Sequence, residues 1–270
     1  MFRRNRTLMN RIKTTFDELS SNDSKALITY IVAGDPDLDT TLNIMNCMVE
    51  EGADIIEIGI PFSDPMAEGV SIQKGHERAL LNKTSIRDAL NLISKFRKSN
   101  KTTPIVFMGY MNTFESMGVK EFCKAAADQG VDGLLIVDMP PEESTEFSTE
   151  AENNGINVIR LIAPTTDISR VKQICDLSSG YIYYISVKGI TGSNDLDSED
   201  VKQKVNLLGS ATDLPIAIGF GIKDSDSALS VKDLADGIVA GSVFVDLIGE
   251  GGDTISKIAN KTKELFLAIK

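Results

Sequence analysis

The sequence is poor in the residues that two classes of enzyme site require. Only one of its 270 residues is a histidine, His76, and the surrounding segment QKGHERAL shows no nucleophile and base placed to act together. This argues against a Ser-His-Asp hydrolase, and we expect His76 to lie on the surface of a helix. No spacing typical of a zinc site or a two-metal site occurs, so we expect no metal.

Paired cysteines and excess basic charge are missing as well. Cys47, Cys123 and Cys175 lie far apart in segments of helical spacing, which predicts buried, reduced thiols in a cytosolic protein. The chain has 28 basic and 39 acidic residues, a net charge of -11 and a pI near 4.7. A nucleic-acid partner is therefore not expected, because binding a phosphate backbone requires a basic face.

No apolar run approaches the roughly 18 to 20 residues that cross a bilayer, and no apolar signal-peptide segment follows the N-terminus. We therefore expect a cytoplasmic protein with no membrane partner. The opening MFRRNRTLMNRIKTTF is rich in arginine and free of acidic residues, as transit peptides are. The alternative that we favour is an amphipathic leader helix ending near Leu19, with Met9 as a possible second start.

Eight short apolar, β-branched segments are present, and most end at glycine or proline. Their nearly continuous hydrophobicity is typical of strands buried on both faces, and segments of helical spacing alternate with them. The pattern predicts one domain, residues 1–270, folded as a (β/α)8 TIM barrel. An open doubly wound sheet is the alternative, but no GxGxxG motif follows the first strand. The expected strands are residues 26–34, 54–62, 103–110, 133–140, 157–164, 180–187, 214–221 and 237–244.

The interval between the second and third strands is unusually long, with 49 residues from one start to the next. It contains FSDPMAEGVSIQKG. We expect an elaborated loop there, at the C-terminal face of the barrel where such folds carry their chemistry.

One carboxylate, Glu57, stands inside an apolar strand. Alternation along the strand places Ile56, Ile58 and Ile60 on one face and Glu57 on the other, so Glu57 is expected to point into the barrel. Burial would raise its pKa and prepare it to exchange protons. The alternative is a structural glutamate in a buried ion pair, although this strand shows no partner for one.

A second carboxylate, Glu68, follows eleven residues later in the turn-rich SDPMAEG. Loop carboxylates are often only solvated surface charges. However, two carboxylates in different surroundings can have separate pKa values and divide acid and base roles between them.

Glycine-rich segments close the last three expected strands. Gly219 and Gly221 end the seventh strand, and Gly241 and Ser242 follow the eighth. Backbone N–H groups at these positions are where barrels often bind phosphate, although the glycines could simply form tight turns. KGITGSN, residues 188–194, could act as a lid and offer Gly192 to the same anion. Its Lys188 could form a Schiff base as in some aldolases, but it lies past the strand.

Six motifs occur together in the order and spacing of one family: IEIGIPFSDPMAEG, FMGYMN, VDMPPEES, YYISVKGITG, IGFGI and VAGSVF. From about Ala26 to its C-terminus the chain resembles the tryptophan synthase α subunit, and GDPDLD after the first strand adds to the likeness. The resemblance implies retro-aldol cleavage of indole-3-glycerol phosphate to indole and glyceraldehyde 3-phosphate, with no cofactor in this chain.

The resemblance also implies roles for individual residues. Glu57 matches the glutamate that moves a proton between the substrate hydroxyl and indole C3. Glu68 stands where the family usually has aspartate, which accepts the indole N–H, so the carboxylate is kept but is one methylene longer. Val187 stands where some members have arginine. The other matched positions are a tyrosine near the catalytic glutamate, an aromatic wall, a lid threonine and a phosphate site: Tyr183, Tyr30, Thr191, and Gly192, Gly221, Gly241 and Ser242.

A partner is implied as well, a β subunit that carries pyridoxal phosphate and receives indole through a tunnel in an α2β2 assembly. The contact surface would include the loop SDPMAEG and residues Asn112, Asp138 and Pro140. Two alternatives stay open, a weakly catalytic subunit with an allosteric role and another phosphosugar lyase or isomerase of the barrel type.

Overall fold

The computed structural model describes residues 10–185, 198–219 and 221–270. Eight parallel strands pair in sequence order, and β8 closes on β1 to complete a barrel. The predicted TIM-barrel fold is confirmed. The strands are β1 Ala26–Val32, β2 Ile55–Gly59, β3 Ile105–Gly109, β4 Gly133–Ile136, β5 Asn157–Ile162, β6 Ile182–Ile185, β7 Ile216–Gly219 and β8 Gly237–Ala240.

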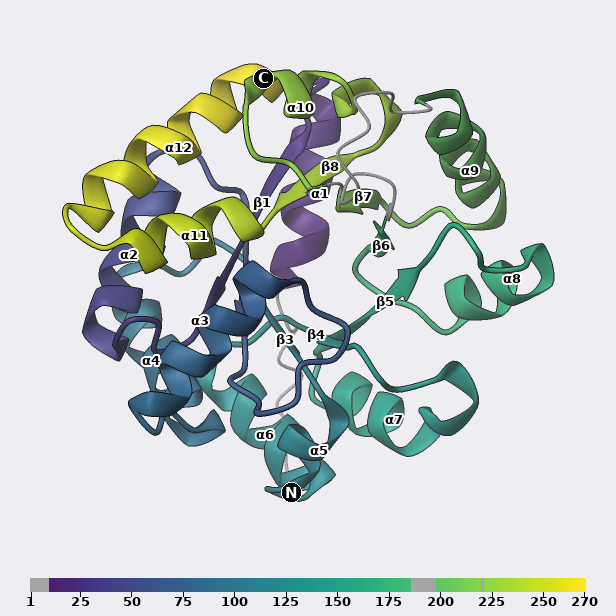
Figure 1. Cartoon of the computed structure of the whole chain (residues 1–270). Helices are drawn as coiled ribbons and strands as arrows, with labels where there is room; N and C mark the ends of the chain where they lie inside the picture. The colour runs from purple at the N-terminus through teal and green to yellow at the C-terminus, as the bar shows by residue number, and fades with distance from the viewer. Residues whose placement is uncertain (1–9, 186–197, 220) are drawn as a thin grey trace.

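The helices are α1 Arg11–Ser21, α2 Leu38–Glu50, α3 Val70–Leu81, α4 Ile86–Ser99, α5 Met111–Glu115, α6 Val119–Gln129, α7 Thr145–Asn153, α8 Ile168–Asp176, α9 Ser198–Ala211, α10 Ser225–Leu229, α11 Ser242–Glu250 and α12 Thr254–Ile269. Most of them surround the strands on the outside of the barrel, whereas α1 lies behind its centre (Figure 1). In the described part of the chain, no helix is long and apolar enough to cross a membrane.

Alternation along the strands divides the core into two layers. Ile56, Ile58 and Ile60 pack in the large cluster between strands and helices, whereas Ile55 belongs to the cluster inside the barrel. The predicted orientation of the second strand is therefore confirmed. The strands end earlier than expected because the turn residues that follow them leave the sheet, and Ser242 already begins α11.

The long interval after β2 differs from the expected loop. Residues 60–69 connect β2 to helix α3, which packs against α11 and β1, and α4 follows α3 before β3 begins. The face of α3 formed by Gly75, His76 and Ala79 is buried. The first turn of α3 contributes the side chains of Ser71 and Ile72 to the barrel mouth.

The expected leader helix is present as α1, two residues longer at its end than predicted. Ile12 and Phe16 are buried against the strand residues inside the barrel, so α1 covers the N-terminal end of the barrel. Arg11 of this helix and Arg97 of α4 both bind the Asp132 carboxylate, which also accepts the Ile105 N–H. The three cysteines are buried and free, as expected.

Candidate active site

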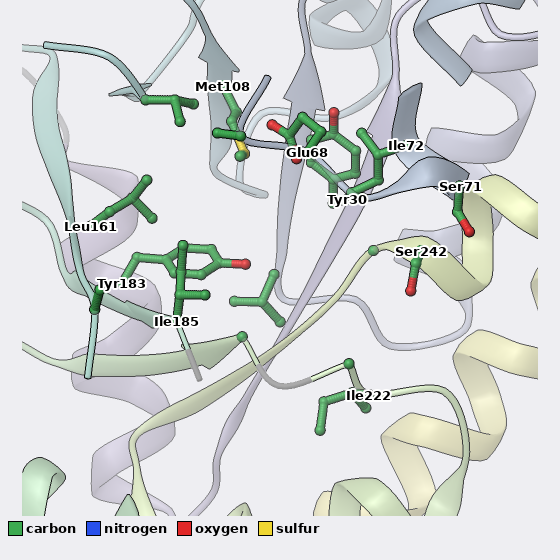
Figure 2. A pocket seen from close by; sticks show the side chains of 18 of the residues that line it. Tyr30, Glu68, Ser71, Ile72, Met108, Leu161, Tyr183, Ile185, Ile222 and Ser242 are labelled. Carbon is green, nitrogen blue, oxygen red and sulfur yellow. The ribbon is translucent and has the colours of Figure 1, made fainter. Parts of the chain in front are cut away.

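A cavity of about 1040 Å³ opens at the C-terminal ends of the strands. Figure 2 shows side chains from several strands and from two helix starts facing it. Part of its lining is apolar and aromatic: Tyr30, Ile72, Met108, Leu161, Tyr183, Ile185, Ile222 and Val239. Polar side chains line it as well, among them Glu68 from the loop after β2 and Ser242 at the start of α11. The cavity therefore suits a ligand with an aromatic part and a charged part.

Glu57 lies inside the barrel, as predicted, and is 0% exposed. Its Oε1 accepts a hydrogen bond of 2.5 Å from the Tyr181 hydroxyl, and its Oε2 has no partner among the described residues. The side chain lies outside the cavity lining, behind the residues that face it. A buried carboxyl oxygen without a partner is costly to keep, which argues against a purely structural role.

Tyr181 is a site residue that the sequence interpretation missed. It is fully buried on the inner face, and its ring packs at 5.8 Å from that of Phe16, so α1 supports the tyrosine that holds Glu57. Alternation along YIYYI could have identified it, because it places Tyr181 on the same face as Tyr183. Tyr183 itself lines the cavity and does interact electrostatically with Glu57.

Glu68 reaches the cavity from the loop after β2, and this loop is held at several points. The Tyr110 hydroxyl accepts the Ala67 N–H at 3.0 Å, and Gln73 Nε2 donates to the Glu68 carbonyl oxygen at 2.8 Å. The Phe62 ring stacks on Tyr110 with 5.0 Å between centroids. The loop is therefore anchored more firmly than its proline and glycine content suggests.

Both carboxyl groups have raised pKa values. Burial raises the pKa of Glu57 to about 8, with a further rise from the charge of Glu68 and an opposing effect of the Tyr181 hydrogen bond. Burial raises the pKa of Glu68 to about 7. At neutral pH Glu57 is thus mainly protonated, while Glu68 is close to half ionised.

Two tyrosines fit against glycines of the neighbouring strands. A Cβ added to Gly59 would lie 2.1 Å from the Tyr30 hydroxyl oxygen, and one added to Gly219 would lie 2.5 Å from that of Tyr183. Gly219, which we expected to offer its N–H to an anion, thus also leaves room for a tyrosine hydroxyl. Tyr30 is one of the aromatic residues that line the cavity.

Three of the predicted phosphate-binding residues meet at one side of the cavity. Gly241 precedes α11, Ser242 is its first residue, and Gly221 lies beside them with φ +60°. The first N–H groups of a helix lack intrahelical acceptors and carry partial positive charge. The predicted Gly192, Thr191, Val187 and Lys188 lie outside the described residues.

Arg78 joins α3 both to the turn after β1 and to α11. Both Asp35 oxygens accept hydrogen bonds of 2.7 Å from Arg78, whose Nη2 also donates to the Val245 carbonyl oxygen. A Cβ at Gly75 would contact Val245 and Asp35, so the helices approach closely only because this residue is glycine. Arg78 and Gly75 thereby hold α3, which follows the Glu68 loop, close against α11.

The expectation that His76 lies on a helix surface is wrong. Its side chain is 2% exposed, and burial lowers its pKa to about 4. One ring nitrogen lies 3.2 Å from the Phe62 nitrogen and the other lies 3.3 Å from the Tyr30 hydroxyl. The helical spacing alone did not reveal that α3 turns this face toward β1 and the loop.

The three predicted interface residues lie close to the mouth. Asn112 is in the first turn of α5, and Asp138 Oδ1 accepts the Met111 N–H at 2.8 Å, which joins α5 to the segment after β4. Asn112 and Asp138 are exposed, and Pro140 is half-buried. Among the described residues, no group of three or more His, Cys, Asp or Glu side chains is placed to hold a metal.

Comparisons with known proteins agree with this geometry. The profile of the family described as "Tryptophan synthase alpha chain" matches residues 16–269. A protein of that name from Thioalkalivibrio sulfidiphilus is 48% identical over 242 residues, covering 90% of this chain and 91% of the relative. One from Nitrosomonas europaea is 43% identical, covering 97% and 96%.

Solved structures give the same result. Tryptophan synthase subunit alpha from Legionella pneumophila is similar with a TM-score of 0.91 and 37% identity, covering 97% of this chain and 98% of that one. A chain from a tryptophan synthase complex of Pyrococcus furiosus is similar with a TM-score of 0.81 and 36% identity, covering 90% and 98%.

Proposed function

The chain belongs to the tryptophan synthase alpha chain family and is a lyase of tryptophan synthesis, and we propose that Glu57 and Glu68 carry out its chemistry. The reaction is the retro-aldol cleavage of indole-3-glycerol phosphate to indole and glyceraldehyde 3-phosphate. The observation that supports these roles most strongly is a fully buried Glu57 and a partly buried Glu68 at one barrel mouth, where burial raises the two carboxyl pKa values to about 8 and about 7.

The two parts of the cavity suit the two ends of this substrate. The phosphate would bind the N–H groups at the start of α11, with Ser242 and the backbone at Gly221 completing the site. The indole ring would lie in the aromatic and apolar part, beside Tyr30 and Tyr183. In this orientation the bond to be broken lies between the phosphate site and the carboxyl groups.

The chemistry requires a proton to move in a closed cycle. Protonated Glu57 gives its proton to indole C3, and the positive charge that develops on the ring is stabilised as Glu68 accepts a hydrogen bond from the indole N–H. The Glu57 carboxylate then takes the proton of the substrate hydroxyl. The C–C bond breaks, its electrons return to the indole ring, the carbonyl of the aldehyde forms, and Glu57 is again protonated.

Glu57 must change position to act in this way. Its carboxyl group is covered and outside the cavity lining, held by Tyr181. A turn of the side chain away from Tyr181 would bring the unpartnered Oε2 into the cavity. Tyr181 therefore holds the carboxyl group in the position that the structure shows.

We also propose a partner, a β subunit that carries pyridoxal phosphate and receives the indole in an α2β2 assembly; this chain needs no cofactor. The Pyrococcus furiosus relative was solved in a tryptophan synthase complex. On this chain Met66, in the loop after β2, is 83% exposed and Val70, at the start of α3, is 67% exposed, while Asn112, Asp138 and Pro140 follow the ends of β3 and β4 at the same end of the barrel. Large exposed apolar side chains beside a site are typical of an interface.

The decisive experiment is a turnover assay with indole-3-glycerol phosphate that follows indole release, with and without a β subunit. We expect release by the chain alone and faster release with the partner. Low turnover in both conditions would support the weakly catalytic allosteric alternative. Trapping of a covalent lysine adduct by borohydride would instead support a Schiff-base aldolase.

A further inference from the structure

The only histidine of the chain is buried beside the proposed active site and touches two of its parts. His76 Nδ1 lies 3.2 Å from the Phe62 backbone nitrogen, at the start of the Glu68 loop. His76 Nε2 lies 3.3 Å from the Tyr30 hydroxyl oxygen, in the cavity wall. No role assigned above uses this residue.

The Phe62 contact determines where the ring hydrogen lies. A backbone N–H can only donate, so Nδ1 must accept and cannot carry a hydrogen. In the neutral ring the hydrogen is then on Nε2, which points at the Tyr30 oxygen. The other tautomer and the imidazolium would each place an N–H against the Phe62 N–H in a buried site, at the cost of an unmade hydrogen bond.

This tautomer of His76 determines how the Tyr30 hydroxyl forms its hydrogen bonds. Its hydroxyl oxygen accepts from Nε2–H, so its own hydrogen is available to an acceptor in the cavity. Glu68 is the carboxylate with the larger electrostatic effect on this tyrosine, ahead of Glu57. Gly59 leaves the space that the hydroxyl occupies.

We propose that His76 is a positioning residue that acts as a neutral Nε2–H tautomer. Its Nδ1 fixes the start of the Glu68 loop, and its Nε2–H makes Tyr30 present a hydrogen-bond donor to the cavity. The kinetic part of this inference rests on the proposed function, because it assumes that Glu68 and the substrate share that space. The tautomer and the loop contact do not depend on turnover.

The first test is spectroscopic and needs no activity. In protein labelled with 15N-histidine there is one ring to observe, and at pH 7 we expect a neutral ring with hydrogen on Nε2. Hydrogen on Nδ1, or an imidazolium, would overturn the proposal. Because these spectra require no substrate, their outcome is independent of whether the chain cleaves indole-3-glycerol phosphate.

Two variants separate the two contacts. His76→Asn places an amide oxygen near the position of Nδ1 and cannot reach Tyr30, so the Phe62 amide should stay protected from hydrogen exchange. His76→Gln can reach Tyr30 but lacks the acceptor near the backbone, so that protection should fall at least about tenfold, the loss of one hydrogen bond. Equal protection in both variants would refute the loop contact.

Turnover then tests the Tyr30 contact. Tyr30→Phe keeps the ring and removes the donor, and we expect kcat to fall about tenfold, as for loss of a hydrogen bond to a charged group. His76→Asn should lose a similar factor, and the double variant should lose no more than either alone. Independent losses that multiply, or full activity in both single variants, would overturn the proposal. The exposed Lys74→Ala on the same helix is the matched control.

Discussion

Asp132 and Glu57 are both buried carboxylates of one barrel, yet their surroundings differ completely. Asp132, before β4 at the N-terminal end, accepts hydrogen bonds from two arginines at 2.7 and 2.6 Å and from the Ile105 N–H at 2.8 Å. Glu57, on β2, accepts one from Tyr181 and leaves Oε2 without a described partner.

The difference separates stability from function in this fold. Burial raises the pKa of Asp132, but Arg97 and Arg11 oppose the rise, and its network joins α1, α4 and β3. Among the residues that the structure describes, no cation opposes the rise in the pKa of Glu57. Full pairing makes a carboxylate a structural link, whereas partial pairing leaves it able to exchange a proton. Five predictions test this contrast, from the largest expected effect to the smallest.

The largest effect is expected on turnover in Glu57→Gln. The amide keeps the volume and can accept from Tyr181, but it cannot carry a proton. We expect kcat to fall by about 10² to 10⁴, the usual contribution of a positioned acid-base group. Steady-state indole release measures it, and near wild-type release would remove Glu57 from the mechanism. Glu152→Gln, exposed on α7, is the control.

Asp132→Asn should damage the fold and spare the chemistry. An amide has one acceptor oxygen, so its NH2 group must face an arginine or the Ile105 N–H. We expect the free energy of unfolding to fall by about 3 to 5 kcal/mol, the cost of breaking a buried ion pair. Urea unfolding measures it, and kcat of the folded protein should be unchanged. The exposed Asp128→Asn, which loses only a surface pair with Lys124, should change stability by less than about 1 kcal/mol.

Substitution of Glu68 should lower kcat less than substitution of Glu57. Glu68→Ala leaves the developing indole cation without a counter-charge, and we expect a loss of about 10²-fold. Glu68→Asp keeps the charge but withdraws it by roughly 1.5 Å. Because Tyr110 and Gln73 hold the backbone, the loop can restore only part of that distance, so activity should lie between the alanine variant and wild type. Full activity in Glu68→Ala would refute the assigned role.

The contrast also predicts a dependence of stability on pH. The folded-state pKa of Glu57 is raised from 4.5 to about 8, so the folded protein keeps a proton that the unfolded chain has lost. Stability therefore falls as pH rises through this window, because the native state binds more protons. Glu57→Gln removes that loss, and we expect it to be more stable than wild type at pH 8 by on the order of 4 kcal/mol.

At pH 4.5 most of this gain should be lost, since half of the unfolded chains are then protonated at Glu57, and well below that pH it should disappear. Urea unfolding at pH 4.5 and pH 8 provides the comparison. A stability difference that does not change with pH would show that Glu57 is ionised in the folded protein. Replacing a paired acid such as Asp132 should lower the stability of the folded protein at both pH 4.5 and pH 8.

The smallest effect is expected at the phosphate site. Ser242→Ala removes one hydroxyl while the helix N–H groups stay, so we expect KM to rise about threefold to tenfold with kcat nearly unchanged. Gly241→Val is a poorer probe than its sequence position suggested, because a Cβ there would meet Tyr30 at 3.3 Å. If inorganic phosphate stabilised wild type and Ser242→Ala against unfolding to the same extent, the Ser242 hydroxyl would have no part in binding the anion.

The sequence by itself determined the strands, the inward direction of Glu57 and the glycines at the barrel mouth. Strand alternation and the order of βα units are local properties, and burial on both faces leaves a continuous apolar signal. Eight strands in the expected order and the Glu57 orientation were predictable for that reason. Tyr181 was within reach of the same alternation.

Only the tertiary structure decided which polar atoms meet. The partners Tyr181 and Glu57 are 124 positions apart, Arg11 and Asp132 are 121 apart, and Tyr30 and His76 are 46 apart. The burial of His76 depends on how α3 packs against β1 and α11, and the anchoring of the Glu68 loop depends on Tyr110 of another strand end. Such contacts follow from closure of the barrel, which no local pattern records, and they decide which buried carboxylate is paired and which stays free to react.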